Sequence, residues 1–401
     1  MPAPAFTTVT IERILPGGLG FAHAEGLTLL VALAAPGDVV RVRIDRVRGK
    51  VAFASIAEII EPSPARVEPP CPYFGVCGGC DFQQLNYQAQ LDAKVEMIRD
   101  CLRRIAQIEN LPEIPIQPAP QQWQYRARAN WQLDPITRRL GYFESGSHRV
   151  CDVEVCAVLA PRLQEILKHV RSEIREGSAG APKDIRAVLG DDLGPDLGPD
   201  NVSVAPPLAG FETSDVSLRV GSESYTFNAD SFFQVNPDLL EALVSEAIGN
   251  ASGEVAIDLY CGAGLFTLPL ARRFARVVGI EVNERASAFA LRNLQSAQLH
   301  NAEVVTAGVG QWLNEHSHSF AVVDFLLLDP PRAGVENIVI KGILDLHPRH
   351  ISYVSCDPAT LARDLKKLLA AGYTLDSLRA FDMFPQTHHV ETVAHLSVGI
   401  L

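Results

Sequence analysis

The chain has 401 residues, of which 47% are hydrophobic and 20% charged, a composition typical of a globular protein with two or three domains. Its longest apolar stretch, residues 26–36, is too short to span a membrane, and its start lacks the features of a signal peptide, so we expect no membrane association and a cytoplasmic location. The formal net charge of −12 excludes a uniformly basic surface for nucleic acid. RNA contact would need local basic islands, and the arginine-rich stretches 41–50 and 121–149 are either such islands or solvated faces.

The first predicted unit, residues 1–62, is a small β-barrel. Apolar and polar residues alternate between Gly/Pro turns in this region, which is the pattern of short, half-buried strands. The expected strands lie at 6–15, 27–34, 38–47 and 50–60. The proline-rich stretch 61–70 indicates a linker that closes the barrel.

The second predicted unit, residues 66–220, is rich in β-strands. It contains a predicted helix at about 87–108, which we expect to pack on the domain that follows. Strands are predicted at 124–133 and 139–143. Residues 176–210 are rich in Gly, Pro and Asp, and this composition predicts a loop or a loose hairpin.

A cluster of three cysteines, Cys71, Cys77 and Cys80, predicts a metal site, because the glycines among them let the backbone wrap around an ion or a cluster. Zinc sites and iron–sulfur clusters usually take four thiolates, so a distant fourth ligand is needed, and Cys151 and Cys156 are the candidates. Spacing alone does not choose between the metals. Eight cysteines in a reducing compartment also argue against disulfides. The alternative is a set of packed cysteines without a metal.

The third predicted unit, residues 223–401, alternates strands with helices. This is the pattern of a doubly wound parallel α/β domain, in which the ligand lies beyond the carboxyl ends of the strands. The expected parallel strands lie at 255–259, 277–280, 303–306, 325–328 and 351–355. Two further β-like runs end the chain. The predicted fold class is therefore α/β, with the barrel and the β-rich central domain preceding it.

A glycine-rich turn follows the first of these strands, in the stretch Asp258-Leu-Tyr-Cys-Gly-Ala-Gly-Leu-Phe266. Gly262 and Gly264 permit a tight turn and a close approach of the backbone to a ligand. Glu281 ends the next strand, where an acid can accept hydrogen bonds from ribose hydroxyls, and Asp329-Pro-Pro-Arg332 follows the fourth strand. The combination is similar to class I S-adenosylmethionine-dependent methyltransferases. The alternatives are a dinucleotide site, or a plain turn with Asp329 as a capping residue.

Cys356 stands between a predicted strand, residues 350–355, and a helix. Asp357 is a natural N-cap, Pro358 fits the first helical position, and residues 359–369 have helical periodicity. The positive end of the helix dipole favours thiolate over thiol, so we predict that the pKa of Cys356 is lowered from its usual value of about 8.5. Cys356 is then a nucleophile. The alternative is a buried cysteine that acts only as a small hydrophobic residue.

Nearly the whole chain resembles the RNA uracil-5 methyltransferase family, the enzymes that make 5-methyluridine in tRNA and ribosomal RNA. The matching motifs are Phe232-Phe-Gln-Val-Asn236, Asp258-Leu-Tyr-Cys-Gly-Ala-Gly264, Asp329-Pro-Pro331, Ser355-Cys-Asp-Pro358 and Phe384-Pro-Gln-Thr-His-His-Val-Glu391. The resemblance implies that the third unit is a class I methyltransferase domain and that the barrel is an OB-like, RNA-binding TRAM domain. It also implies that the central domain carries an iron–sulfur cluster.

The resemblance assigns roles to particular residues. It implies that Cys356 is the nucleophile and that Glu391 is the base. The implied contacts to S-adenosylmethionine are Gln234, Tyr260, Glu281 and Asp329. The implied ligands of a 4Fe-4S cluster are Cys71, Cys77, Cys80 and, in preference to Cys151, Cys156, with zinc as the alternative metal. The chain departs from the family pattern at Leu265, where some members have an asparagine near the cofactor, and at Gly308, where others have a polar residue.

The implied reaction transfers a methyl group from S-adenosylmethionine to carbon 5 of a uridine in structured RNA, with 23S rRNA as the expected substrate and a monomer as the expected state. Carbon 5 of uracil is a poor nucleophile, and addition of the Cys356 thiolate to carbon 6 would give it electron density. Glu391 would then remove the carbon-5 proton so that the thiolate can leave. The uridine has to be flipped or looped out to reach these groups.

The sequence leaves several alternatives open. The same chemistry could act on a tRNA uridine, the target base could be cytosine, or the protein could be a non-catalytic RNA-binding or redox-sensing protein. His388 and His389 compete with Glu391 for the role of base. Arg126, Arg128, Trp123 and Trp131 could hold RNA through phosphate pairing and stacking, or they could be ordinary sheet residues.

Overall fold

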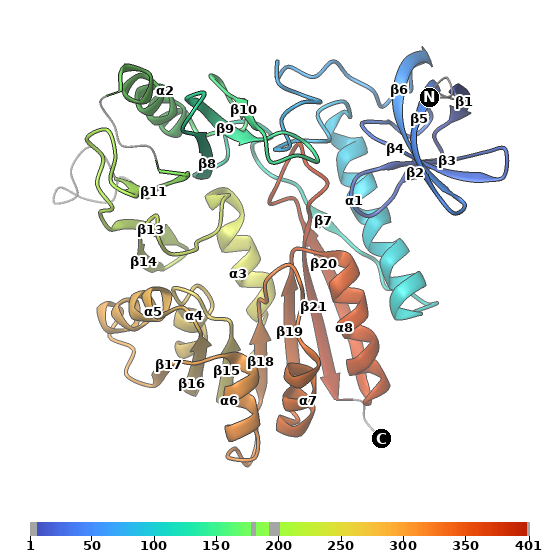
Figure 1. Cartoon of the computed structure of the whole chain (residues 1–401). Coiled ribbons are helices and arrows are strands. Elements are labelled where there is room, and N and C mark those ends of the chain that lie inside the picture. The colour runs from blue at the N-terminus through green and yellow to red at the C-terminus, as the bar shows by residue number, and fades with distance from the viewer. Residues whose placement is uncertain (1–5, 178–181, 192–200, 399–401) are drawn as a thin grey trace.

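The computed structural model describes residues 6–177, 182–191 and 201–398. Figure 1 shows an N-terminal barrel in blue, a central sheet in green, and a larger sheet flanked by helices in yellow to red. The predicted fold class, a doubly wound α/β domain preceded by a barrel and a β-rich domain, is confirmed. Among the described residues, no helix combines the length and the apolar character needed to cross a lipid bilayer.

The barrel is one sheet with the strand order β1-β5-β6-β4-β3-β2. Its strands are β1 (Phe6–Thr10), β2 (Arg13–Ile14), β3 (Gly20–Ala24), β4 (Leu27–Val31), β5 (Val39–Arg48) and β6 (Val51–Glu61). Burial alternates along β5, where Val40 and Val42 are buried and Arg41 is exposed, as expected for strands with one face in a core. Arg66 ties the following linker to the barrel by donating to Asp38 at 3.0 Å and to the Leu33 carbonyl at 3.0 Å.

Helix α1 (Tyr87–Cys101) starts at Asn86, whose side chain accepts a hydrogen bond from the backbone N–H of Ala89. It continues into a π-helical turn, η1 (Leu102–Ala106), and ends before the expected residue 108 because Gln107 adopts a left-handed conformation, with φ +61°. The helix packs against α8 (Pro358–Ala370) of the C-terminal α/β domain. Its apolar residues share one core with the strands of the large sheet.

The central sheet has the strand order β10-β9-β8-β11-β12 and is covered by helix α2 (Pro161–Glu176). Its strands are β8 (Arg128–Asp134), β9 (Arg139–Phe143), β10 (Val150–Asp152), β11 (Asp184–Leu189) and β12 (Val202–Ala205). Of the two predictions for 176–210, a loop or a loose hairpin, the described residues support the hairpin, because 184–189 and 202–205 pair as antiparallel strands. The buried residues Ile185 and Ala187 alternate along β11, but the Gly/Pro-rich surroundings concealed this pattern. Residues 192–199, a tandem Asp-Leu-Gly-Pro repeat in the sequence, lie outside the described residues.

The large sheet has the strand order β17-β16-β15-β18-β19-β21-β20-β7. Its strands are β7 (Ile116–Gln117), β15 (Gly253–Leu259), β16 (Phe274–Glu281), β17 (Ala302–Thr306), β18 (Phe325–Leu328), β19 (His350–Ser355), β20 (Tyr373–Phe381) and β21 (Glu391–Val398). Strands β15 to β19 run parallel, whereas β21 runs antiparallel to both β19 and β20. The five predicted parallel strands and the two β-like runs at the end are all present.

Helices cover both faces of this sheet (Figure 1). They are α3 (Leu240–Ile248), α4 (Thr267–Ala271), α5 (Glu284–Ser296), α6 (Val309–His316), α7 (Asn337–Leu346) and α8, with the 3-10 turn η2 (Pro237–Leu239) before α3. The strands β13 (Val216–Val220) and β14 (Glu223–Phe227) form a hairpin. Its buried residues, Phe227 among them, belong to the same apolar core as the buried residues of α3. Neighbouring residues of β15 point to opposite faces, so that Ala256 joins one core and Ile257 the other.

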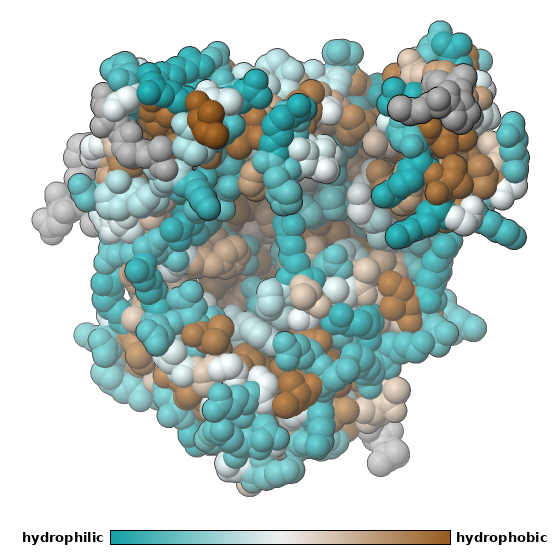
Figure 2. Space-filling view, in the orientation of Figure 1, coloured by the Kyte–Doolittle hydropathy of each residue, from teal (hydrophilic) through white to brown (hydrophobic). Residues whose placement is uncertain are grey.

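The carboxyl ends of the parallel strands face the upper part of the molecule (Figure 1). Figure 2 shows that the surface is hollowed at this level, between the central sheet and the barrel above and the large sheet below. Polar residues surround the hollow and apolar residues lie inside it. A ligand of a doubly wound sheet binds beyond the carboxyl ends of its strands, so this level is where the predicted site residues are expected.

Candidate active site

Cys356 and Glu391 are brought together by the register of two antiparallel strands. Val354 of β19 pairs with Val393 of β21, and Ser355 pairs with Thr392. The ladder ends at that pair, and the next residues are Cys356, directly after β19, and Glu391, the first residue of β21, which are close enough for the charge of Glu391 to raise the pKa of Cys356. Cys356 is half-buried, and Glu391 is 2% exposed. Two predicted site residues that are distant in the sequence therefore lie side by side at the carboxyl end of β19.

The helix that follows Cys356 starts as predicted. Asp357 is the N-cap and accepts a hydrogen bond from the Thr360 backbone N–H at 2.8 Å, and Pro358 is the first residue of α8. The predicted lowering of the cysteine pKa is wrong, however. Burial raises the pKa of Cys356 to about 12, and the nearby charges of Glu391 and Asp329 act in the same direction. Asp357 also adds negative charge at the helix N-terminus, which opposes the effect of the dipole.

Glu391 is a carboxyl group in an apolar, acidic environment. Burial raises its pKa well above the usual range, and the nearby charge of Asp329 raises it further, whereas Arg332 lowers it. Its Oε1 atom has no hydrogen-bond partner among the described residues. A raised pKa makes the carboxylate a stronger proton acceptor, and the free oxygen is available to a ligand.

The two competing bases are less suitable. His388 is occupied by Asp81, which lies 2.5 Å from its Nδ1 atom. Burial, together with the positive charges of His388 and Arg332, lowers the pKa of His389 to about 3. His389 is therefore neutral at physiological pH and a weak proton acceptor.

Tyr260, Glu281 and Asp329 follow or end three adjacent strands, β15, β16 and β18, so the sheet order gathers them at one edge. The turn after β15 is sharp: Tyr260 has φ +66°, and Gly262 and Gly264 have φ +55° and +91°. Glu281 holds this turn in place, because its Oε2 atom accepts a hydrogen bond from the Gly262 N–H at 3.0 Å. The arrangement leaves a backbone cradle at the positions where the sequence predicts a cofactor.

Two carboxyl groups lie at the same edge, that of Asp258 fully buried and that of Asp329 half-buried. Burial raises the pKa of Asp329 to about 7. Burial also raises the pKa of Asp258 to about 7, and the charges of Asp329 and Glu281 contribute to this rise. Asp258 accepts a hydrogen bond from Thr267 at 2.6 Å through one oxygen, while its other oxygen has no partner among the described residues. The edge therefore favours a positively charged ligand.

Gln234 is nearly buried and lies on the segment between β14 and η2. This segment is fixed by stacking of Phe233 on Phe227, with ring centroids 4.1 Å apart, and by the Arg128 guanidinium, which donates to the Ser231 carbonyl at 2.7 Å. Arg128 thus supports the loop of Gln234 rather than standing free for RNA. Asn236 was not predicted to be a site residue. Its side-chain amide is fully buried, and both of its polar atoms are unpaired among the described residues. Asn236 is therefore a candidate contact for a ligand.

Arg332 is a further residue without a role in the sequence prediction. It follows Asp329-Pro-Pro331, is exposed, and its charge lowers the pKa of both Cys356 and Glu391. An arginine beside a thiol and a carboxyl group stabilises the charged forms of both. Its place in the Asp-Pro-Pro-Arg sequence was the available signal.

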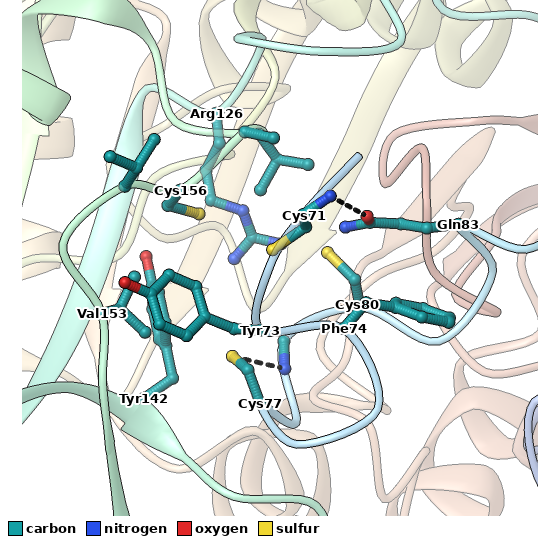
Figure 3. A pocket seen from close by; sticks show the side chains of 14 residues that line it. Cys71, Tyr73, Phe74, Cys77, Cys80, Gln83, Arg126, Tyr142, Val153 and Cys156 are labelled. Atoms are coloured by element: carbon teal, nitrogen blue, oxygen red, sulfur yellow. Dashed lines mark hydrogen bonds between the residues drawn. The ribbon is translucent and has the colours of Figure 1, made fainter. Parts of the chain in front are cut away.

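The cysteine cluster forms a second site, above the large sheet. Cys71, Cys77, Cys80 and Cys156 line one cavity together with aromatic residues and Arg126, whereas Cys151 is buried in β10 and does not line it. Figure 3 shows the four sulfur atoms turned toward a common space. Burial raises the pKa of Cys77 and Cys80 to about 12.

Two of the residues considered for RNA binding contribute instead to the interior of the protein. Arg126 lines the cysteine cavity, and Trp131 is completely buried in the core of the central sheet. In the part of the chain that the structure describes, no group of three or more His, Cys, Asp or Glu side chains is close enough together to hold a metal ion.

Known families match two parts of the chain. The family described as tRNA (Uracil-5-)-methyltransferase matches residues 211–398, and the TRAM domain of tRNA (uracil(54)-C(5))-methyltransferase matches residues 7–65. The chain is 33% identical to the 23S rRNA (uracil(1939)-C(5))-methyltransferase RlmD of Vibrio parahaemolyticus, over 96% of this chain and 94% of the relative. It is 32% identical to an uncharacterized RNA methyltransferase of Thermosynechococcus vestitus, over 97% of both chains.

A solved structure also covers nearly the whole chain. It is the Pyrococcus abyssi tRNA (uracil-54, C5)-methyltransferase in complex with S-adenosyl-L-homocysteine, with a TM-score of 0.73 and 26% sequence identity. The similarity covers 97% of this chain and 100% of that one. The barrel, the central domain and the large sheet are therefore similar as a set.

Proposed function

Because the chain belongs to the family of S-adenosylmethionine-dependent RNA uracil-5 methyltransferases, we propose that it methylates a uridine of 23S rRNA through a covalent adduct between Cys356 and carbon 6 of the uracil. The observation that carries the proposal is the pairing of β19 with β21, which brings Cys356, directly after β19, close to Glu391, the first residue of β21. Covalent methylation at carbon 5 needs a nucleophile on one carbon of the ring and a base for the proton on the next. Adjacent residues of two paired strands meet that requirement.

Cys356 and Glu391 divide the reaction between them. The Cys356 sulfur forms a bond to carbon 6, and the electron pair of the 5,6 double bond moves toward carbon 5 and the carbonyl at carbon 4. S-adenosylmethionine, when bound, would supply the methyl group to carbon 5, with its sulfonium–methyl bond breaking to leave S-adenosylhomocysteine. Glu391 then accepts the carbon-5 proton, the double bond re-forms, and the sulfur–carbon bond breaks to release the Cys356 thiolate.

The electrostatics of the site set a condition on the first step. With its pKa raised to about 12, Cys356 is a thiol at neutral pH in the protein without ligands. Asp329 and Glu391 oppose thiolate formation, and Arg332 favours it. We propose that Arg332 and a cationic cofactor at the edge with Asp258 and Asp329 offset the negative charge when the substrate binds.

The residues proposed for the cofactor are Gln234, Tyr260, Glu281 and Asp329. Glu281 is fixed by the Gly262 and Asn283 backbone N–H groups, at 3.0 and 2.7 Å, and each of its oxygens keeps a lone pair for a ribose hydroxyl. Tyr260 and Gly262 form the backbone turn that a nucleoside can approach closely. Asp329 lies between this turn and Cys356, a position suited to the reactive end of the cofactor.

We propose that Cys71, Cys77, Cys80 and Cys156 hold a 4Fe-4S cluster. Zinc requires all of its sulfur ligands at about 2.3 Å from one ion. A 4Fe-4S cluster instead takes one thiolate at each of four irons, so its ligands stand around a volume. The shared cavity of the four cysteines supports the proposal, because it gathers four thiols around one space.

The choice of 23S rRNA as substrate is supported by the relative from Vibrio parahaemolyticus, whose name specifies that RNA and which is 33% identical. The structural relative from Pyrococcus abyssi is named for tRNA and is 26% identical. Mass mapping of 5-methyluridine in 23S rRNA and tRNA from a deletion strain distinguishes the two. Loss of the mark from tRNA alone would contradict the ribosomal assignment. We place the enzyme in the cytoplasm, where both RNAs are found.

Incubation with RNA that contains 5-fluorouridine tests the covalent mechanism. Fluorine at carbon 5 cannot be removed as a proton, so the adduct should persist and appear as a protein band of higher mass on a denaturing gel. The band should require both S-adenosylmethionine and Cys356. A protein that methylates ordinary RNA but gives no adduct with 5-fluorouridine RNA would exclude the Cys356 addition.

A further inference from the structure

The loop 382–390, which leads directly into Glu391, is held by residues from distant parts of the sequence. Lys94 of α1 forms a buried ion pair with Asp382 and donates to the Phe384 carbonyl at 3.1 Å. The hydroxyl of Tyr125 donates to the Pro385 carbonyl at 3.0 Å. Figure 1 shows the loop rising above the large sheet to lie between α1 and the central sheet. The conformation of the loop is therefore set from outside the catalytic domain.

Gln386 is the bend of this loop. It is buried and has φ +69°, a left-handed conformation that costs energy for a residue other than glycine. Gln90 of α1 holds it with two hydrogen bonds, from the Gln386 N–H at 2.9 Å and to the Gln386 side-chain oxygen at 3.0 Å. The Gln386 carbonyl accepts from the N–H groups of Asp81 and Phe82, at 3.2 and 3.0 Å. Such strain persists only where the surroundings fix it.

Asp81 contacts the loop at His388, close in the sequence to the proposed base, Glu391. One of its oxygens accepts a hydrogen bond from the His388 backbone N–H at 2.8 Å, and the other lies 2.5 Å from His388 Nδ1. Asp81 directly follows Cys80, one of the cysteines that line the cavity. His388 is three residues before Glu391. Cys80 is therefore connected to Glu391 by its neighbour Asp81, by the contact of Asp81 with His388, and by the short stretch of backbone from His388 to Glu391.

A turn of the barrel also packs against Asp81 and His388. Gly18 lies in the turn between β2 and β3 with φ +80°, and a Cβ atom there would stand 3.0 Å from both Asp81 Oδ2 and His388 Cβ. The absence of a side chain at residue 18 lets the turn close over the pair. Three separate parts of the chain, the barrel turn, the cysteine segment and the catalytic loop, meet at Asp81 and His388.

We propose that Asp81 is a positioning residue for Glu391, and that through it the cysteine segment sets the place of the catalytic base. The inference rests on the proposed covalent mechanism, in which Glu391 acts only after Cys356 has added to the ring. Loss of the Asp81 contact therefore affects the second half of the reaction. Adduct formation, which needs Cys356, continues, whereas proton removal from carbon 5 and release of the thiolate slow down.

The experiment compares Asp81→Ala with the wild-type protein on ordinary RNA and S-adenosylmethionine. Release of methylated RNA should slow by about tenfold or more, less than the roughly hundredfold or greater loss expected when a base is removed outright, while adduct formation in a single turnover stays within about threefold. Methylated RNA covalently attached to protein should accumulate on denaturing gels. Asp81→Asn should restore release, because its amide oxygen still accepts from the His388 N–H. Iron content is measured for each variant, and it should equal that of the wild type.

Matched controls separate this role from a general loss of structure. Asp92→Ala removes an exposed acid from α1, in the same region of the chain, and should leave both rates unchanged. Hydrogen exchange should show faster exchange of the residue 386–390 amides in Asp81→Ala but not in Asp92→Ala. If Asp81→Ala does not fold, His388→Ala removes the side-chain half of the contact and should give the same accumulation.

The outcomes distinguish the two levels of the argument. If wild-type protein gives no adduct with 5-fluorouridine RNA, the proposed mechanism fails and the positioning role fails with it. If wild-type protein gives the adduct, but Asp81→Ala and His388→Ala release product at the wild-type rate, the positioning role alone is wrong. Equal slowing of adduct formation and release would also contradict it, because a misplaced base does not affect the first step.

Discussion

Lys94 on α1 and Asp382 on the loop before β21 form an ion pair in which neither side chain is exposed to solvent. Burial lowers the pKa of Lys94, and the charge of Asp382 acts in the opposite direction. The pair joins an N-terminal helix to the last part of the catalytic domain. It connects two segments whose relative placement determines where Glu391 lies.

We predict that Lys94→Ala destabilises the protein by about 3–5 kcal/mol, because it leaves the Asp382 carboxylate buried without a counter-ion. Urea unfolding followed by tryptophan fluorescence measures the change. Arg41→Ala, which breaks the exposed pair with Glu58, is the control and should cost less than about 1 kcal/mol. A Lys94→Ala protein as stable as the control would show that the buried pair contributes little.

The pKa of about 12 for Cys356 predicts how the free protein reacts with iodoacetamide. Only the thiolate reacts, so the alkylation rate at Cys356 should rise by about tenfold per pH unit between pH 7 and 9 without levelling off. Glu391→Gln removes a charge that raises this pKa, so it should increase the rate at pH 9. Peptide mass spectrometry reads out the modified cysteine, and Cys356→Ala gives the background. A plateau below pH 8 is incompatible with the raised pKa.

Cofactor affinity should depend on pH through Asp258 and Asp329, whose pKa values are both raised to about 7. Each carboxyl group is neutral below that pH and negatively charged above it. The sulfonium of S-adenosylmethionine is attracted to the charged forms, so its Kd should fall by up to about tenfold from pH 6 to pH 8. S-adenosylhomocysteine lacks the sulfonium charge and should respond less. Calorimetry on both compounds tests this, and identical pH dependence would argue against a sulfonium near these acids.

The lining of the cysteine cavity predicts that Cys156 is needed for metal binding and that Cys151 is not. Cys156 lines the cavity and Cys151 does not, although either could serve from its spacing alone. Cys156→Ser should lose the brown colour and most of the iron after anaerobic purification, whereas Cys151→Ser should keep about four irons per chain. Iron analysis and absorption spectra give the answer. Retention of iron by Cys156→Ser and its loss from Cys151→Ser would reverse the assignment.

The periodicity of the sequence predicted the large sheet well, because buried parallel strands such as 325–328 are short, continuous apolar runs between helices. For other elements, the local sequence pattern was too weak to predict a strand. β11 and β12 lie among Gly and Pro, and β7 is only two residues long. The tertiary pairing with β8 and β20 that makes them strands does not show in local sequence.

The site was predicted as a set of residues but not as an arrangement. The proximity of Cys356 and Glu391 depends on β21 returning antiparallel between β19 and β20, which no local pattern specifies. The pKa of Cys356 was predicted in the wrong direction because the helix N-terminus is visible in the sequence, whereas burial and the charge of Asp329 are not. The contact between Asp81 and His388 joins residues that are far apart in the chain and was not foreseen.

The edge strand β7 comes from residues 116–117, yet it completes the catalytic sheet beside β20, and α1 packs on α8 from the same distant region. During synthesis these N-terminal pieces leave the ribosome on the order of ten to fifty seconds before their partners exist. The nascent chain must keep the apolar side of α1 away from other polypeptides for that interval. The C-terminal segments, made last, are the ones that allow folding to finish.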